Sequence, residues 1–190
     1  LIAYELPMVL AVVGVIIQAG TMSLNGIVFA QADGSIFGWG GIGFPYILTQ
    51  FVGFFIFIAA VQAELTQPPF DMPVAESEIV SGYQVEYTGF RFLIFFLAEF
   101  ATAFAFAAIA AVLFLGGWAV PWLPTSSDWY YVLGPIVLFA KVMVVAFIIF
   151  WVRFTYPRFR EDQLQSLAWK VLIPLALLNI VVTAVFKVVL

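Results

Sequence analysis

Long apolar stretches, separated by short polar or glycine-rich segments, dominate the chain. A helix needs roughly 20 mainly apolar residues to cross ~30 Å of hydrocarbon. The pattern predicts five such helices, at about residues 3–22, 45–64, 88–115, 131–152 and 169–190. The alternating segments typical of a barrel do not occur, and only helices and closed barrels satisfy every backbone group in lipid. We therefore expect an all-α transmembrane bundle that forms one integral membrane domain over residues 1–190.

Composition agrees with this fold class and restricts the chemistry. The sequence is 65% hydrophobic and only 9% charged, which is typical of a polytopic membrane protein. It contains neither Cys nor His, so it offers no thiolate or imidazole to hold an iron-sulfur cluster, haem or zinc. We expect no metal site in this chain. If redox chemistry occurs, other chains must carry the electrons.

Two loops of opposite charge predict the orientation. The acidic loop, residues 64–87, follows the second predicted helix and contains five carboxylates without a Lys or Arg. The basic loop, residues 153–168, follows the fourth predicted helix and includes Arg153, Arg158 and Arg160. Loops rich in Lys and Arg stay in the cytoplasm, and an acidic loop two helices earlier must lie on the same side. The start of a short helix, at about 73–81, is indicated by Asp71 and Pro73.

Several ionisable residues fall within or at the ends of the apolar stretches, namely Glu5, Glu64, Glu99 and Lys141. A charge at mid-membrane costs roughly 2.5 to 3.5 kcal/mol, so such groups usually pair, face a polar interior or serve function. Two interpretations stay open for Glu99. It pairs with Lys141 to fix helix register, or, as we prefer, it belongs to a proton relay of buried carboxylates. The acidic loop likewise is either an ordinary solvated loop or part of a functional site.

Four motifs resemble the family of the membrane-embedded H subunit (subunit 1) of proton-pumping NADH-quinone oxidoreductase, respiratory complex I. They are "LIAYELP", "AELTQPPFDMPVAESEIVSGYQVEYTGFRFLIFFLAEF", "LFLGGW" and "IFWVRFTYPRFREDQLQSLAWKVLIPLALLN". The resemblance covers nearly all of the chain. It implies that the sequence corresponds to the C-terminal five-span portion of an eight-span subunit. The opening "LIAYELP", which is neither an initiator Met nor a signal peptide, is in line with this expectation.

The resemblance implies a role and a set of residues. The chain would anchor the peripheral arm, form part of the quinone-reduction chamber and relay quinone reduction to proton translocation. The implied proton relay comprises Glu5, Glu64, Glu76, Glu78, Glu99 and Lys141. The implied chamber comprises Gln67, Phe70, Asp71, Glu76, Glu78, Glu86 and Arg91, and the implied contact with the peripheral arm comprises Arg153, Arg158, Arg160 and Asp162. No covalent catalytic residue is expected.

The same resemblance implies the surroundings of the chain. It would bind no cofactor itself and would meet quinone as a substrate. FMN and iron-sulfur clusters would lie in partner subunits. The partners would be the iron-sulfur and quinone-module subunits of the peripheral arm, small membrane subunits of the pump arm, and the lipid bilayer, without nucleic acid. The expected location is a bacterial or archaeal plasma membrane, or the inner mitochondrial membrane for an organellar protein.

Two positions depart from the family pattern, which reads roughly A-E-x-N-R-x-P-F-D-x-P-E-A-E. Gln67 stands where the pattern has Arg, and Val74 stands where it has Glu. The local charge balance is unchanged, but a quinone contact through that Arg is in doubt.

Two alternative functions stay open. One is the anchor subunit of a related membrane-bound hydrogenase or of a ferredoxin- or deazaflavin-fed complex. The other is a stand-alone ion-coupled transporter, although such proteins usually have internal repeats.

From the number of Lys and Arg residues in each loop, we predict that the acidic and basic loops are both cytoplasmic. Because the chain has no native Cys, single cysteines introduced into residues 63–87 and 153–170 report accessibility without background. Both sets should react with an impermeant thiol reagent from the cytoplasmic side only. Labelling of the two loops from opposite sides would contradict the five-helix topology.

Overall fold

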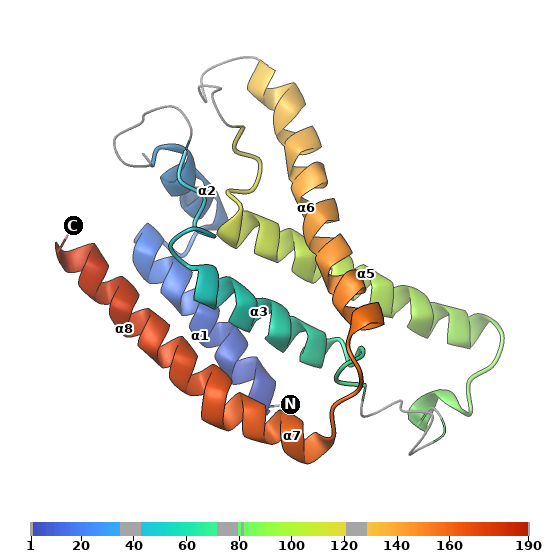
Figure 1. Cartoon of the computed structure of the whole chain (residues 1–190). Helices are drawn as coiled ribbons and strands as arrows, with labels where there is room; N and C mark the ends of the chain where they lie inside the picture. The colour runs from blue at the N-terminus through green and yellow to red at the C-terminus, as the bar shows by residue number, and fades with distance from the viewer. Residues whose placement is uncertain (1, 35–42, 72–79, 81, 121–128, 190) are drawn as a thin grey trace.

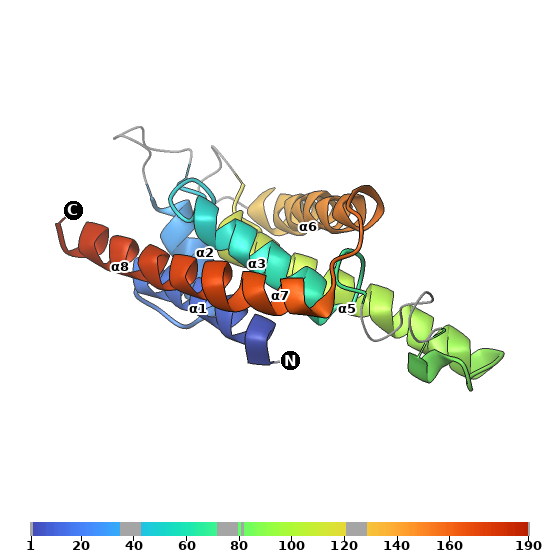
Figure 2. The ribbon, with the colours of Figure 1, turned by 60° about the horizontal axis from the view of Figure 1, so that its bottom comes forward.

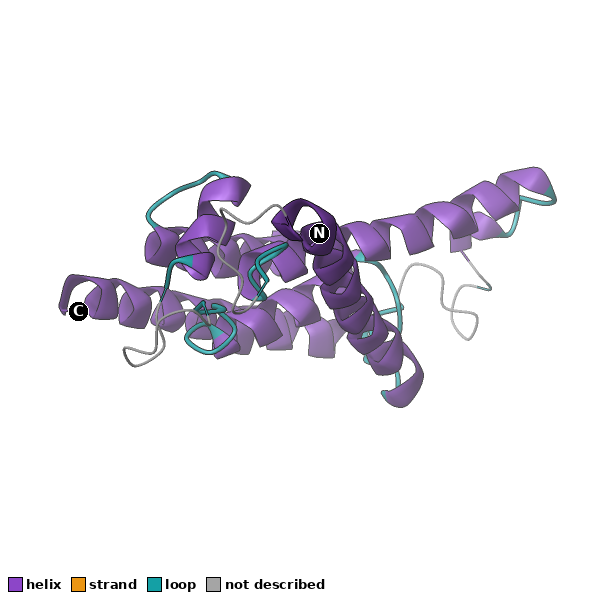
Figure 3. Ribbon diagram, turned by 90° about the horizontal axis from the view of Figure 1, so that it is seen from above, coloured by secondary structure: helices purple, strands orange, loops and turns teal. Residues whose placement is uncertain are grey.

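The chain is all-helical wherever the computed structural model describes it, which is at residues 2–34, 43–71, 80, 82–120 and 129–189. Within these ranges there are helices and loops but no strand (Figure 3). The α-helices are α1 (Ile2–Ala19), α2 (Leu24–Ala32), α3 (Phe51–Glu64), α5 (Phe90–Phe114), α6 (Trp129–Thr155), α7 (Glu161–Leu167) and α8 (Ile173–Val189). A 3₁₀ turn, η1 (Gly82–Gln84), precedes α5, and a π-helical turn, η2 (Ala168–Leu172), joins α7 to α8.

Four of the five predicted membrane helices are confirmed as helices of the structure. The segments Ile2–Ala19, Phe90–Phe114, Trp129–Thr155 and Glu161–Val188 are long and apolar enough to cross a membrane. The stretch expected to be helical over 45–64 is helical only from Phe51, and its 14 residues rise about 21 Å. That length is less than the ~30 Å of hydrocarbon. The all-α class is therefore confirmed, whereas five crossings remain a prediction.

The segment expected as the basic loop, residues 153–168, is mostly helical. Helix α6 continues to Thr155 and α7 begins at Glu161, so only residues 156–160 connect them. Two acids, Glu161 and Asp162, lie in the first turn of α7, where they complement the positive end of the helix dipole. The short helix expected at about 73–81 falls almost entirely outside the described residues.

The pattern of long apolar stretches did not predict α2. This helix has nine residues, too few to cross a membrane, and it follows α1 after a short turn. Its buried residues are Ile27, Val28 and Gln31, a spacing that places them on one helical face. The criterion of about 20 apolar residues cannot detect such a short helix, although this periodicity does indicate it.

Helices α1, α3 and α8 lie side by side, and α5 and α6 cross beside them (Figure 1). The core between them contains Ala11 of α1, Phe54 and Phe57 of α3, and Phe114 of α5. The rings of Phe54 and Phe57 lie 5.4 and 5.7 Å from the ring of Phe114. The first part of α5 extends beyond the other helices (Figure 2), and residues 90–98 are exposed.

Buried side chains satisfy the backbone where α5 ends. The Gln31 amide nitrogen donates to the carbonyl oxygens of Val112 and Leu113 at 3.1 and 3.2 Å, and its oxygen accepts from the Tyr46 N–H at 3.0 Å. The Ile47 N–H donates to the Phe114 carbonyl at 2.8 Å. The last carbonyls of a helix have no intrahelical partner, and lipid offers none. Gln31 therefore allows α5 to end inside the protein.

Replacing Gln31 with Leu should destabilise the protein. The change preserves most of the side-chain volume but leaves buried backbone groups unsatisfied, at about 1 to 3 kcal/mol for each such group. Thermal unfolding in detergent should show a lower midpoint than for wild type. The matched control is Gln165→Leu, because Gln165 is exposed on α7. Equal shifts for both variants would contradict the assigned role.

Candidate functional site

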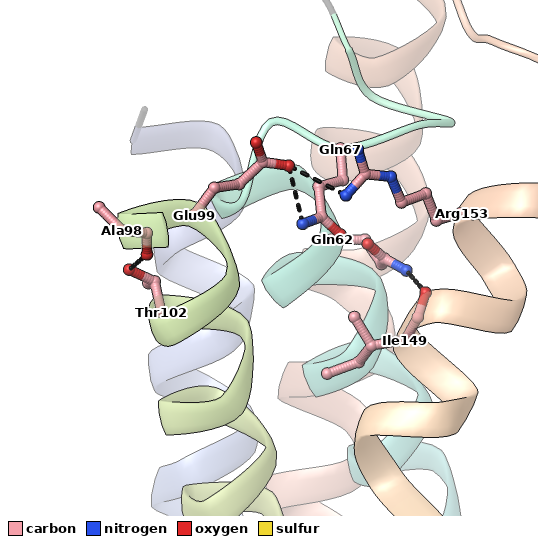
Figure 4. Close-up of polar contacts among 7 residues, drawn as sticks. All are labelled: Gln62, Gln67, Ala98, Glu99, Thr102, Ile149 and Arg153. Atoms are coloured by element: carbon pink, nitrogen blue, oxygen red, sulfur yellow. Dashed lines mark hydrogen bonds and ion pairs between the residues drawn. The ribbon is translucent and has the colours of Figure 1, made fainter. Parts of the chain in front are cut away.

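The candidate site is centred on the carboxylate of Glu99, the tenth residue of α5. One carboxylate oxygen, Oε1, accepts a hydrogen bond from Gln67 Nε2 at 3.0 Å and another from Arg153 Nη1 at 3.1 Å (Figure 4). Gln67 follows α3, and Arg153 lies in the last turn of α6. Glu99 therefore joins its own helix to two segments that are 32 and 54 positions away from it in the chain.

The site is largely shielded from solvent. Gln67 is fully buried, and the side chains of Arg153 and Glu99 are 21% and 24% exposed. The Arg153 guanidinium also lies over the Phe100 ring, 5.6 Å from its centroid, a distance at which cation–π attraction operates. Screening by salt is weak for a partly buried pair. Loss of either partner would leave an uncompensated charge in an apolar environment.

The alternative interpretation, in which Glu99 pairs with Lys141, is wrong. Lys141 Nζ instead donates to the carbonyl oxygens of Gly117 and Ala119, both at 2.9 Å, in the segment after α5. Lys141 and Arg153 are 12 residues apart on α6, which is about 18 Å of helix rise. Only Arg153 is therefore level with Glu99. The resemblance placed Arg153 at the contact with the peripheral arm, but its guanidinium is bound inside this chain.

Glu99 also lies nearer the end of the bundle than its place in the sequence suggests. About twelve residues of the predicted helix precede it, which would place it deep in the membrane. However, Gln67 contacts it and lies only three residues beyond Glu64, the last residue of α3. The beginning of α5 extends past the bundle, and this extension brings Glu99 level with the end of α3.

Sequence reasoning missed a second buried amide in the site. Gln62, on α3, is 1% exposed and donates through Nε2 to the Ile149 carbonyl of α6 at 2.6 Å (Figure 4). Ile149 lies one helical turn before Arg153. Gln62 therefore ties α3 to the turn of α6 that carries the cation. A Gln within an apolar helix is itself a signal of helix–helix hydrogen bonding in membranes.

Two further acids of the implied relay lie at the same end of the bundle. Glu64 ends α3 and is half-buried, whereas Glu5 is exposed in the first turn of α1. Tyr4, next to Glu5, packs against the cluster of Ala63, Phe70 and Leu164, and Ala63 precedes Glu64. Within the described residues, no hydrogen-bond donor reaches the buried oxygens Oε2 of Glu64 and Oε1 of Gln67. Glu76 and Glu78, the other acids implied for the relay, lie outside the described residues.

The described parts of the acidic and basic loops are in contact. The Phe159 N–H donates to the Pro69 carbonyl at 2.8 Å, and the rings of Phe70 and Phe159 stack with centroids 5.6 Å apart. Phe70 is 5% exposed and packs with Leu164 of α7. The two segments therefore lie at one end of the bundle. Which side of the membrane this end faces remains a prediction.

The remaining predicted site residues are distributed unevenly. Gln67, Phe70 and Asp71 are near one another, because the Phe70 N–H donates to the Gln67 carbonyl at 2.8 Å and Asp71 follows Phe70. Asp71 is half-buried. Glu86 and Arg91 are exposed near the start of α5. Arg158 is half-buried, and exposed Arg160 pairs with Asp162 at 3.3 Å. Across the described ranges there is no cluster of three or more His, Cys, Asp or Glu residues that could hold a metal.

In the described part of the chain, four helical segments of membrane-spanning length, joined by buried amides and a partly buried ion pair, define a multi-pass membrane protein. The family model described as NADH dehydrogenase matches residues 1–184, and the chain belongs to this family. The NADH-quinone oxidoreductase H subunit of Brevibacillus brevis is 48% identical over 185 residues, which are 97% of this chain and 51% of that protein. The proteins of the same name from Anoxybacillus flavithermus and Geobacillus kaustophilus are 46% and 45% identical over 98% of this chain and 52% of each relative. The chain thus spans about half the length of these relatives.

The contact between Glu99 and Arg153 should appear as an energetic coupling. Glu99→Gln and Arg153→Gln each leave one partly buried charge without its partner, whereas the double variant removes both charges. We expect a coupling free energy of roughly 0.5 to 3 kcal/mol from thermal unfolding of the four proteins. The control cycle combines Asp162→Asn with Arg160→Gln, an exposed pair for which the coupling should be within error. Equal couplings in both cycles would contradict a special role for the Glu99 pair.

Proposed function

We propose that this chain is the C-terminal, five-span part of the membrane subunit that anchors the peripheral arm of a proton-pumping NADH-quinone oxidoreductase. In this proposal the chain forms part of the quinone-reduction chamber and passes the effect of quinone reduction into the membrane. The family and the names of the bacterial relatives support the type of complex. They also favour it over the anchor of a hydrogenase or a stand-alone transporter. The fifth crossing is α3 together with residues 45–50 before it.

The observation that carries the mechanism is the contact of Glu99 with both Gln67 and Arg153. Gln67 belongs to the acidic loop. The proposed chamber residues are Gln67, Phe70, Asp71, Glu76, Glu78 and Glu86 of this loop, together with Arg91 of α5. Through Gln67, a displacement or charge change in the loop acts directly on Glu99. The amide of Gln67 has no charge, so it serves as a hydrogen-bonding link here and does not replace the Arg of the family pattern.

Reduction of a quinone to a quinol consumes two protons, and nearby carboxylates respond to the charge that this leaves. We propose that Glu64, Glu76, Glu78 and Glu99 form a coupled set, with Glu5 at its edge. Protonation of Glu99 would remove its attraction to Arg153 and free the guanidinium to move. The buried acceptor oxygens of Glu64 and Gln67 fit ordered water, which would connect carboxylates that do not touch. Lys141 is left outside this set because two carbonyls bind its ammonium group.

The exposed surfaces of the chain would contact partner subunits and lipid. Arg158, Arg160 and Asp162, beside the acidic loop, would meet the iron-sulfur and quinone-module subunits of the peripheral arm. FMN and the iron-sulfur clusters would belong to those partners. The exposed apolar faces of α5 and α6 would meet lipid or neighbouring small membrane subunits. Because the three relatives are bacterial, the proposed location is a bacterial plasma membrane.

Replacing Glu99 with Gln should lower quinone-linked proton uptake more than assembly. The substitution keeps the size of the side chain and one acceptor oxygen but removes the titratable proton and the charge. The measurement is quinone-dependent proton uptake per assembled complex in membrane vesicles, where we expect a loss of about a hundredfold or more, the lower end of general acid–base effects.

The matched control is Glu161→Gln, because Glu161 is an exposed acid in the first turn of α7 and belongs to none of the three proposed residue sets. It should leave proton uptake per complex unchanged. If Glu99→Gln shows normal uptake per complex and reduces only the amount of complex, Glu99 has a purely structural role. Recovery of assembly in the double variant with Arg153→Gln would support that structural role as well.

A further inference from the structure

A second polar cluster lies at the end of the bundle opposite Glu99. It lines a cavity of about 740 Å³ formed by Gln18 of α1, residues 44–50 before α3, and the last two turns of α8. The opposite ends of α1 and α3 carry Glu5 and Glu64, and the Glu99 site adjoins the end of α3. The C-terminal end of α8 accordingly lies far from α7 (Figure 1). The cavity is within the volume range of small-molecule sites.

One wall of the cavity is a fixed hydrogen-bond network around Gln50, which is 1% exposed. Its Nε2 donates to Thr183 Oγ1 at 2.6 Å and to Gln18 Oε1 at 3.1 Å, and its Oε1 accepts from Asn179 Nδ2 at 2.6 Å. A Cβ atom at Gly53 would lie 3.2 Å from both Gln50 Oε1 and Asn179 Nδ2. The absence of a side chain there makes room for the network, which is therefore built into the packing of α3 and α8.

The rest of the cavity combines apolar walls with one cation. Phe44, Val182 and Phe186 supply apolar surface, and Lys187 is exposed at the rim. Lys187 Nζ donates to the Gln18 carbonyl at 2.8 Å, which holds the ammonium group beside the cavity. Among the described residues, no carboxylate oxygen lies within 4.0 Å of this ammonium. An ammonium group has three protons to donate, so further acceptors can bind.

We propose that this cavity binds one anionic phospholipid, with its phosphate at Lys187 and an acyl chain along Phe44, Val182 and Phe186. Three features favour this occupant. Lys187 lies in the last turn of a membrane helix, where lipid headgroups are expected. Its charge is complementary to a phosphodiester, and the adjoining walls suit a hydrocarbon chain. The inference rests on the membrane location of the chain and not on the proposed quinone chemistry.

Photo-crosslinking tests the proposal in the complete membrane assembly that contains this chain. The assembly is reconstituted in phosphatidylcholine nanodiscs with traces of phosphatidylglycerol that carries a diazirine in one acyl chain. Mass spectrometry should locate crosslinks on Phe44, Val182 or Phe186. A phosphatidylcholine probe with the same diazirine should label these residues several-fold less, and inorganic phosphate should not compete.

Substitutions separate the contributions of charge and shape. Lys187→Gln should reduce phosphatidylglycerol labelling about fivefold, because one Lys near a membrane surface contributes about 1 kcal/mol to the binding of an anionic lipid. Lys187→Arg should retain labelling, and Val182→Trp should abolish it by filling the cavity. The matched control is Lys170→Gln, a loss of the same charge from η2 near the opposite end of α8, which should leave labelling unchanged.

Several results would overturn the proposal. Equal labelling by both probes would show that the cavity does not select an anionic lipid. Competition by inorganic phosphate would identify a phosphate site without an acyl chain. Absence of crosslinks at all three residues would mean that another protein segment fills the cavity. Unchanged labelling in Lys187→Gln would remove the role of the cation. None of these outcomes depends on quinone turnover, so failure here is distinguishable from failure of the proposed function.

Discussion

The structure depends on the need to satisfy polar groups where water is absent. Four glutamines, Gln31, Gln50, Gln62 and Gln67, are at most 1% exposed, and each donates a hydrogen bond to a different part of the chain. An amide carries both donors and acceptors and has no charge to desolvate, so it can connect helices at lower cost than an ion. Gln31 allows α5 to end within the protein, and Gln62 fixes α3 against α6. The helices can therefore be broken or short without exposing their backbone.

The Glu99 site combines these amide contacts with charge. Gln62 fixes the turn of α6 that carries Arg153, Arg153 binds Glu99, and Gln67 joins Glu99 to the segment that follows α3. The stacking of Phe70 on Phe159 brings the beginning of the acidic loop against the basic segment. Changes at this end of the bundle therefore involve three helices at once. Such an arrangement supports the proposed response of this chain to chemistry in an adjoining chamber.

The two ends of the bundle differ in character. At the Glu99 end, Glu99 of α5 pairs with Arg153 of α6, and Glu64 ends α3. At the other end, amides and hydroxyls of α1, α3 and α8 form a network, and Lys187 is the cation beside it. A charged pair can change its interaction when a proton or substrate arrives, whereas a neutral amide network keeps one geometry. This contrast supports a responsive role for the first end and a structural, lipid-facing role for the second.

Local features determined what the sequence could predict by itself. Length and continuity of apolar residues indicated the helices at 88–115 and 131–152 to within about three residues, and the lack of Cys and His limited the metal chemistry. The acid at position 99 was recognised because a carboxylate is costly in an apolar stretch. Its partner was not, because Arg153 and Lys141 are both cations on α6. Only the crossing of α5 and α6, and the extension of α5 beyond the bundle, decided that Arg153 lies beside Glu99. Gln31, Gln50 and Gln62 were missed for the same physical reason: their hydrogen bonds to residues 81 to 133 positions away depend on how helices pack, which local composition does not specify.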